Sequence, residues 1–185
     1  MLLTTERLLL RDLLAHDWHA VWAYQSDPRF LRSTPEPPLR QEQVQQWVQE
    51  YIGWQHEQPR CTFQLAIVLQ TTERVIGSCG IRLVTAHAQQ AELGYELHPD
   101  YWGQGYATEA ARSLLAFGFQ TLQLQGVWAE CLPENTGSIQ VLERLGMRYT
   151  HRLHQHTLMQ NRWRDLLEYV MDRAAWQAHT AMGRE

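Results

Sequence analysis

The residues whose types and spacing best suit chemistry lie between positions 92 and 110, where a strand pattern gives way to a helix pattern. The turn that joins the two carries Gly103 and Gly105 directly before the helix begins. Glycine lets a backbone approach a ligand closely, and the free N–H groups and dipole of a helix start favour negative charge. We therefore expect an anion site here, with a pyrophosphate as its ligand. A tight turn that binds nothing is the alternative, and a dinucleotide fingerprint is excluded because its third glycine would fall at Thr108.

Apolar periodicity predicts the elements that position this turn. The predicted strands are 7–12, 63–69, 75–84, 91–97, 126–132, 147–156 and 163–171, and the predicted helices are 16–25, 41–54, 105–119 and 136–145. This order gives a mixed α+β fold with a mostly antiparallel sheet flanked by about four helices. It lacks the repeated β-α units of a doubly wound dinucleotide fold.

The length of 185 residues and the mass of 21.7 kDa indicate one domain. We assign it to residues 1–176 and expect the tail, 177–185, to fray. A hydrophobic content of 44% is enough for a sizeable core. The formal net charge of −4 argues against a nucleic acid as partner, and no apolar run approaches the length of a membrane span.

All 16 cationic side chains are arginine, because the sequence contains no lysine. This absence excludes a P-loop nucleotide site, a pyridoxal-phosphate Schiff base, a protein-kinase site and a Ser-x-x-Lys acyl enzyme, each of which needs a lysine.

The cysteines are odd in number and show no C-x-x-C spacing, which argues against a disulfide framework or a structural zinc site; they are Cys61, Cys79 and Cys131. Three histidines fall close together in the predicted strand 147–156, namely His151, His154 and His156. No carboxylate motif accompanies them, so we predict no metal site. A reducing, cytoplasmic location without a secretory leader fits these features.

The segment from Glu92 to Ala110 resembles the central motif of the GCN5-related N-acetyltransferases, and specifically the branch that acetylates ribosomal-protein alanine and serine N-termini. The family's cofactor loop reads Arg/Gln-x-x-Gly-x-Gly/Ala, and residues 102–107 fit it with Trp102 at the first position. Residues 135–139 and 145–147 are similar to the branch's Asn-x-x-Ser and Leu-Gly-Phe elements, and residues 5–11 to its first strand. The resemblance spans about residues 4–171 in the same order.

This resemblance implies a sheet splayed in the middle, between the strands 91–97 and 126–132, and acetyl-coenzyme A as co-substrate. The pantetheine arm of this co-substrate is expected to form hydrogen bonds with backbone groups near Leu97 and His98 and with the amide of Asn135. The turn residues expected to bind the cofactor are Gly103, Gln104, Gly105, Tyr106, Ala107 and Thr108. A helix N-cap is the alternative role for Asn135, and both roles can coexist.

The resemblance also implies acetyl transfer to a primary amine, which in this branch is a protein or peptide N-terminal amine. The attacking amine must be neutral, because an ammonium group has no lone pair, and an α-amine has a pKa near 8. Glu96 lies beside the expected splay, on the strand face opposite to Leu93, Tyr95 and Leu97, and we predict that it is the general base. Its alternatives are a solvated carboxylate or a group that positions the substrate ammonium, and His98 is a second candidate base.

Some family members protonate the departing thiolate with a Tyr seven residues after the Asn, but Leu142 occupies that position here. Ser138 is the hydroxyl available instead, with a role in the first helical turn as its alternative. The missing Tyr leaves a second function open, that of an acyl-coenzyme A sensor or scaffold with little or no turnover. The sequence does not distinguish a peptide from a small-molecule acceptor, or a monomer from a homodimer.

Overall fold

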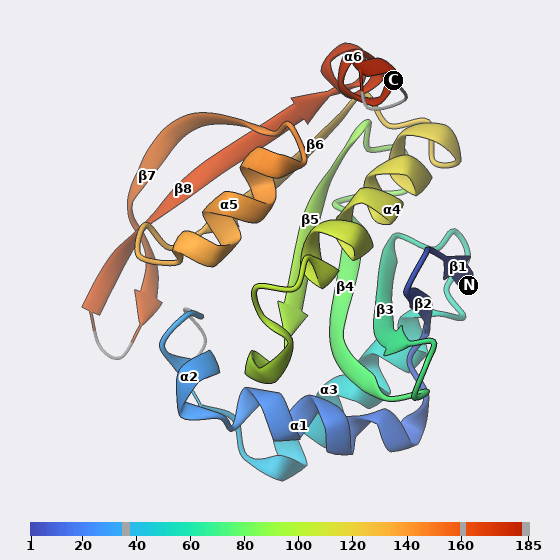
Figure 1. Cartoon of the computed structure of the whole chain (residues 1–185), viewed down its shortest axis with the longest axis vertical. Coiled ribbons are helices and arrows are strands. Elements are labelled where there is room, and N and C mark those ends of the chain that lie inside the picture. The colour runs from blue at the N-terminus through green and yellow to red at the C-terminus, as the bar shows by residue number, and fades with distance from the viewer. Residues whose placement is uncertain (35–37, 160–161, 183–185) are drawn as a thin grey trace.

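A computed structural model describes residues 1–34, 38–159 and 162–182 of the chain. Its strands form one sheet, with helices packed on both faces (Figure 1). The strands are β1 (Leu2–Thr4), β2 (Leu8–Asp12), β3 (Thr62–Leu69), β4 (Val75–Leu83), β5 (Gln90–Leu97), β6 (Gly126–Cys131), β7 (Arg148–Met159) and β8 (Arg162–Asp172). The α-helices are α1 (Trp18–Gln25), α2 (Pro28–Leu31), α3 (Gln41–Trp54), α4 (Tyr106–Gln120), α5 (Thr136–Arg144) and α6 (Arg173–Met182), and the 3₁₀ turns are η1 (Ala15–Asp17) and η2 (Pro99–Tyr101).

The sheet has the order β1-β2-β3-β4-β5-β6-β8-β7, and every neighbouring pair is antiparallel except β5 and β6. The parallel pair is short. Its register runs from Gln90 opposite Gly126 to Glu92 opposite Trp128 and ends there. Among the described strands, the remainder of β5 therefore pairs with β4 alone, and Figure 1 shows β6 and β8 turning away from it. The predicted mixed α+β fold and its central splay are confirmed.

Both faces of the sheet carry apolar side chains, as β3 shows by alternation. Leu65 and Ile67 join the main core, in which α4 packs on β4 and β5. Ala66 and Val68 point to the other face, where Tyr51 of α3 packs against the same cluster. Burial on both faces explains the continuous apolar run of this strand.

Several short elements go beyond the sequence-based expectation. Strand β1 pairs with β2, and α2 begins at Pro28 with the Asp27 side chain accepting a hydrogen bond from the N–H of Arg29. The predicted helices 16–25 and 41–54 leave this short helix out, although an N-cap followed by proline in the first turn starts a helix. The described part of the chain thus holds six α-helices instead of about four.

The tail expected to fray is helical as far as Met182, and residues 183–185 lie outside the described part. Helix α6 is held by Trp176, whose ring stacks on Phe119 of α4 at a centroid distance of 5.2 Å. His179 of the same helix lies against Gly146. No helix among the described residues is long and apolar enough to cross a membrane.

Candidate active site

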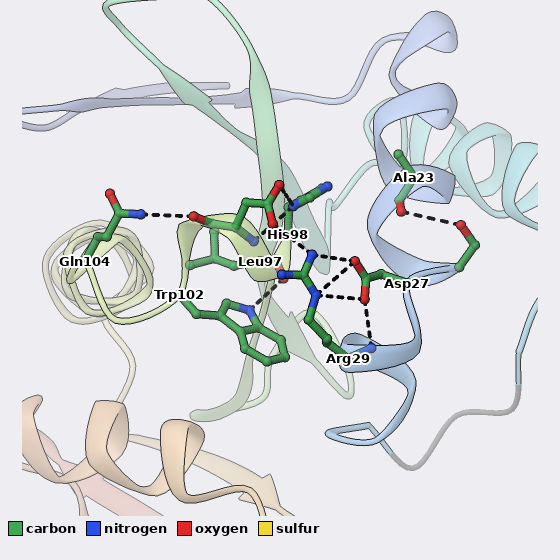
Figure 2. Close-up of polar contacts among 9 residues, drawn as sticks. Ala23, Asp27, Arg29, Leu97, His98, Trp102 and Gln104 are labelled. Carbon is green, nitrogen blue, oxygen red and sulfur yellow. Dashed lines mark hydrogen bonds and ion pairs between the residues drawn. The ribbon is translucent and has the colours of Figure 1, made fainter.

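The end of β5 forms one edge of the gap in the sheet. The N–H of His98 donates to the carbonyl of Ile76 at 2.8 Å, so it is used by the ladder with β4. Alternation then directs the backbone groups of Leu97 to the opposite edge, toward the gap. The Leu97 carbonyl accepts a hydrogen bond from Nε1 of Trp102 at 2.9 Å (Figure 2). Of the backbone groups predicted to hold the pantetheine arm, the Leu97 N–H is the one aimed at the gap.

The turn after η2 has the backbone of an anion cradle. Gly103 and Gly105 have φ angles of +74° and +82°, a region that side chains other than glycine rarely adopt. Gly105 is the N-cap of α4, so the first amides of the helix have no intrahelical partner. Thr108, in the first turn, has a buried hydroxyl with no hydrogen-bond partner among the described residues. An orphaned hydroxyl beside free amides fits a phosphate group of coenzyme A.

Arg7, in the turn between β1 and β2, contacts this cradle. Its Nη1 donates to the carbonyl of Gln104 at 2.9 Å, and its guanidinium lies over the ring of Tyr106 at 4.4 Å. Glu109, one turn into α4, accepts from the N–H of Arg7 at 2.8 Å, from its Nε at 2.7 Å and from the hydroxyl of Thr5 at 2.6 Å. Burial acts to raise the pKa of Glu109, but these hydrogen bonds outweigh it and hold that pKa below its ordinary value.

The same turn is tied to α2 by a bridging arginine. Nη2 of Arg29 lies 2.7 Å from Asp27 and 2.8 Å from Asp100, and Figure 2 shows Arg29 beside Asp27. The N–H of Asp100 donates to Nδ1 of His98 at 3.2 Å, and its carbonyl accepts from Gln104 at 3.0 Å. One imidazole nitrogen of His98 is therefore used to shape the turn, which favours Glu96 over His98 as the base.

Glu96 projects to the sheet face that α1 covers. Its Oε2 accepts hydrogen bonds from the hydroxyl of Tyr24 and from Nε2 of Gln25, each at 3.0 Å. Burial and the nearby Glu96 carboxylate raise the pKa of Tyr24 well above its ordinary value, so this phenol stays protonated. Tyr24 also lies 3.4 Å from Oγ of Ser78, which in turn accepts from Gln64 at 3.0 Å. The carboxylate is thus fixed by neutral donors.

Two hollows meet at this carboxylate, and both are lined by Gln25, Trp47 and Glu96. The first extends toward Tyr51 and the second toward Phe30. Apart from Glu96, every described residue that lines them is uncharged.

Ser138 lies on the other face of β5, at the start of α5. Its Oγ is 2.8 Å from the hydroxyl of Tyr95, and its N–H donates to Oδ1 of Asn135 at 3.0 Å. Asn135 is therefore the N-cap, and its Nδ2 donates to the carbonyl of Ser33 at 2.7 Å. Burial raises the pKa of Cys131 to about 11, although a hydrogen bond with Ser138 acts to lower it.

The structure thus places both predicted catalytic residues beside the gap in the sheet. Glu96 lies on one face of β5 and Ser138 on the other. Three neighbours were not foreseen: Tyr24, Gln25 and Tyr95. For Tyr95, strand alternation beside Glu96 was an available signal. Leu142, at the position of the family's Tyr, is fully buried in the core.

A family model for the acetyltransferase (GNAT) domain matches residues 7–148. The chain belongs to the GNAT acetyltransferase family. An uncharacterised N-acetyltransferase of Bacillus subtilis, YnaD, is 30% identical over 95% of this chain and 99% of its own. A ribosomal protein uS5-alanine N-acetyltransferase of Escherichia coli is 25% identical over 94% of this chain and 92% of its own. A GNAT-family acetyltransferase structure from Bacillus anthracis superposes with a TM-score of 0.82, at 28% identity, over 94% of this chain and 99% of its own.

The GNAT protein described here is therefore an N-acetyltransferase that uses acetyl-coenzyme A. The bound co-substrate supplies an activated acetyl thioester, and the open β5 edge, the cradle and the orphaned Thr108 hydroxyl fit it. The predicted family and co-substrate are confirmed.

Proposed function

We propose that this GNAT protein acetylates the α-amino group of a peptide or protein N-terminus. The observation that carries the proposal is the surroundings of Glu96: two hollows meet at its carboxylate, and their other described lining residues are all uncharged. A free amino acid would place its carboxylate near that site, where none of the described lining residues offers a cation. A polyamine would call for several carboxylates along its length, and the described lining offers one. A peptide brings an amine with no adjacent charge.

Glu96 is the general base in this proposal. An α-amine with a pKa near 8 is largely protonated at neutral pH, so the base must remove a proton, directly or through water, before or during attack. The hydrogen bonds from Tyr24 and Gln25 keep Oε2 of Glu96 in place as an acceptor. Ser138 donates its hydroxyl proton toward the departing thiolate from the other face of β5.

The co-substrate is held by the residues predicted from the motif. The N–H of Leu97 serves the pantetheine arm, and His98 shapes the turn that follows. The amides of the turn and of the first turn of α4 take the pyrophosphate, from Gly103, Gln104, Gly105, Tyr106, Ala107 and Thr108. Asn135 caps α5, and the remaining hydrogen-bonding capacity of its amide serves the pantetheine.

The relative from Escherichia coli supports the choice of acceptor, because its name specifies the alanine of a ribosomal protein. The substrate preference to be tested is therefore that of this enzyme for an α-amine without a neighbouring carboxylate.

A thiol-release assay with acetyl-coenzyme A tests the proposal. The panel compares short peptides that begin with alanine or serine with free alanine, a polyamine and the same peptides blocked at the α-amine. We expect the highest kcat/KM for the peptides with a free α-amine and no turnover for the peptides blocked at that amine. Equal or faster turnover of free alanine or of the polyamine would overturn the peptide assignment.

A further inference from the structure

Gln25 carries a buried polar atom that the proposed mechanism does not use. The residue is the last of α1 and is 7% exposed. Its Nε2 donates to Oε2 of Glu96 at 3.0 Å. Its Oε1 is fully buried and has no hydrogen-bond partner among the described residues. Gln25 lines both hollows that meet at Glu96.

The orientation of this amide follows from its neighbour. Oε2 of Glu96 accepts from the Tyr24 hydroxyl as well, so the group facing it must be a donor. A flipped Gln25 would set two acceptor oxygens 3.0 Å apart, which electrostatic repulsion forbids. The amide NH₂ is therefore committed to Glu96, and the carbonyl oxygen is turned away from it.

A buried carbonyl oxygen without a donor is unfavourable, and such atoms in native proteins call for an explanation. The atom belongs to an amide that bonds the expected base, on a residue that lines both hollows, so a substrate N–H is the donor that fits. A neutral primary amine has two N–H groups and one lone pair. With one N–H on Glu96 and the other on Oε1 of Gln25, both hydrogens are bound and the lone pair is left for attack.

We infer that Gln25 is a specificity-determining residue that accepts the second N–H of the acceptor and so selects primary over secondary amines. This inference rests on the proposed role of Glu96 as the base. A secondary amine has a single N–H, so it cannot satisfy both acceptors. A site built to bond an N–H discriminates against an analogue that lacks it.

The test compares matched amines in the wild type and in Gln25→Met, which keeps the side-chain volume close and removes both polar atoms. The substrate pairs are an alanyl peptide with its N-methylalanyl counterpart, and a simple primary alkylamine with its N-methyl counterpart. The measured quantity is the ratio of kcat/KM for the primary amine to that for the secondary amine. Gln46→Met, the same change on the exposed face of α3, is the control.

We expect the wild type and Gln46→Met to favour the primary amine by about tenfold or more, and Gln25→Met to lose most of this preference. The loss should come from slower reaction of the primary amine, with the melting temperature kept within a few degrees. If Gln25 only positions Glu96, both members of each pair slow by the same factor and the ratio stays unchanged, which would overturn the inference.

The two amine pairs separate this inference from the peptide assignment. Turnover of the alkylamine pair without turnover of the peptide pair would overturn the peptide acceptor, and the alkylamine ratio would still decide the role of Gln25. An unchanged ratio in Gln25→Met, with good peptide turnover, would overturn the role of Gln25 and keep the peptide acceptor.

Discussion

The hydroxyl of Tyr95 lies 2.8 Å from Oγ of Ser138 and 3.1 Å from the Ser138 carbonyl, which ties β5 to the first turn of α5 across the splay. Glu96, the next residue of β5, points to the opposite face and bonds Tyr24 and Gln25 of α1. One strand thus presents a phenol on one side and a carboxylate on the other, at the point where its pairing with β6 has ended.

Ser138→Ala should lower kcat modestly, by about tenfold or about 1.4 kcal/mol. The effect is small because a thiol with a pKa near 8.5 gives a tolerable leaving group without an acid. Coenzyme A affinity and the melting temperature should be nearly unchanged, since the cap of α5 uses the N–H of Ser138 and not its hydroxyl. Steady-state kinetics measures kcat, and calorimetry measures the affinity and the melting temperature. Ser113→Ala in α4 is the matched control.

Tyr95→Phe should lower kcat by a similar factor, because its phenol and the Ser138 hydroxyl form one hydrogen-bonded unit. The double variant Tyr95→Phe with Ser138→Ala should then fall no further than either single variant, since residues that act together are not additive. Falls that multiply in the double variant would show that the two hydroxyls act independently.

Glu96→Gln should lower kcat by about a hundredfold at neutral pH if Glu96 removes a proton from the amine. The defect should shrink as the pH rises through about 8, because more of the α-amine is then neutral without help. A pH profile of kcat checks this. Glu92→Gln, on the same face of β5 four residues earlier, is the control. A loss confined to KM and independent of pH would instead assign Glu96 to substrate positioning.

Gly105→Glu should abolish measurable binding of acetyl-coenzyme A while the protein stays folded. The new side chain brings negative charge to the pyrophosphate cradle, and a φ of +82° disfavours any residue but glycine. Gly53→Glu, at an exposed position of α3 where a Cβ meets nothing within 4 Å, is the matched control. Isothermal calorimetry that finds unchanged affinity in folded Gly105→Glu would contradict the assignment of the cradle.

Glu109→Gln should destabilise the protein at neutral pH by about 2 kcal/mol, as expected for lost hydrogen bonds to a charged group. The pKa of Glu109 is lowered in the folded state, so its contribution is complete above the unfolded value and is lost as the pH falls through the folded one. The gap in melting temperature between wild type and variant should therefore close below about pH 4. Glu42→Gln, in the first turn of α3, should show no such gap. A gap in melting temperature that persists at low pH would contradict a role for the charged carboxylate of Glu109.

The sequence predicts those parts of the site that depend on local pattern. Alternation along β5 places Glu96 opposite Tyr95, and glycine spacing anticipates the positive φ angles of Gly103 and Gly105. The N-cap role of Asn135, predicted as the alternative to cofactor binding, is seen in the structure. Each of these features is set by neighbours within a few residues.

The partners of Glu96 could not be predicted in this way. Tyr24 and Gln25 are 72 and 71 residues away in the chain, and they reach the carboxylate because α1 packs across the sheet. The same holds for Arg7 and Glu109, which are 102 residues apart. Such contacts depend on how whole elements pack, which periodicity does not encode.

The most direct test of the central claim is tandem mass spectrometry of a peptide that begins with alanine and contains one internal lysine, after incubation with the protein and acetyl-coenzyme A. The peptide is neutral around its α-amine, so it suits the uncharged hollows at Glu96, and its lysine offers a competing amine. We predict a single acetyl group, located on the α-amine, and its loss in Glu96→Gln at neutral pH. Acetylation of the lysine side chain instead, or no transfer from a protein that binds acetyl-coenzyme A, would contradict the claim.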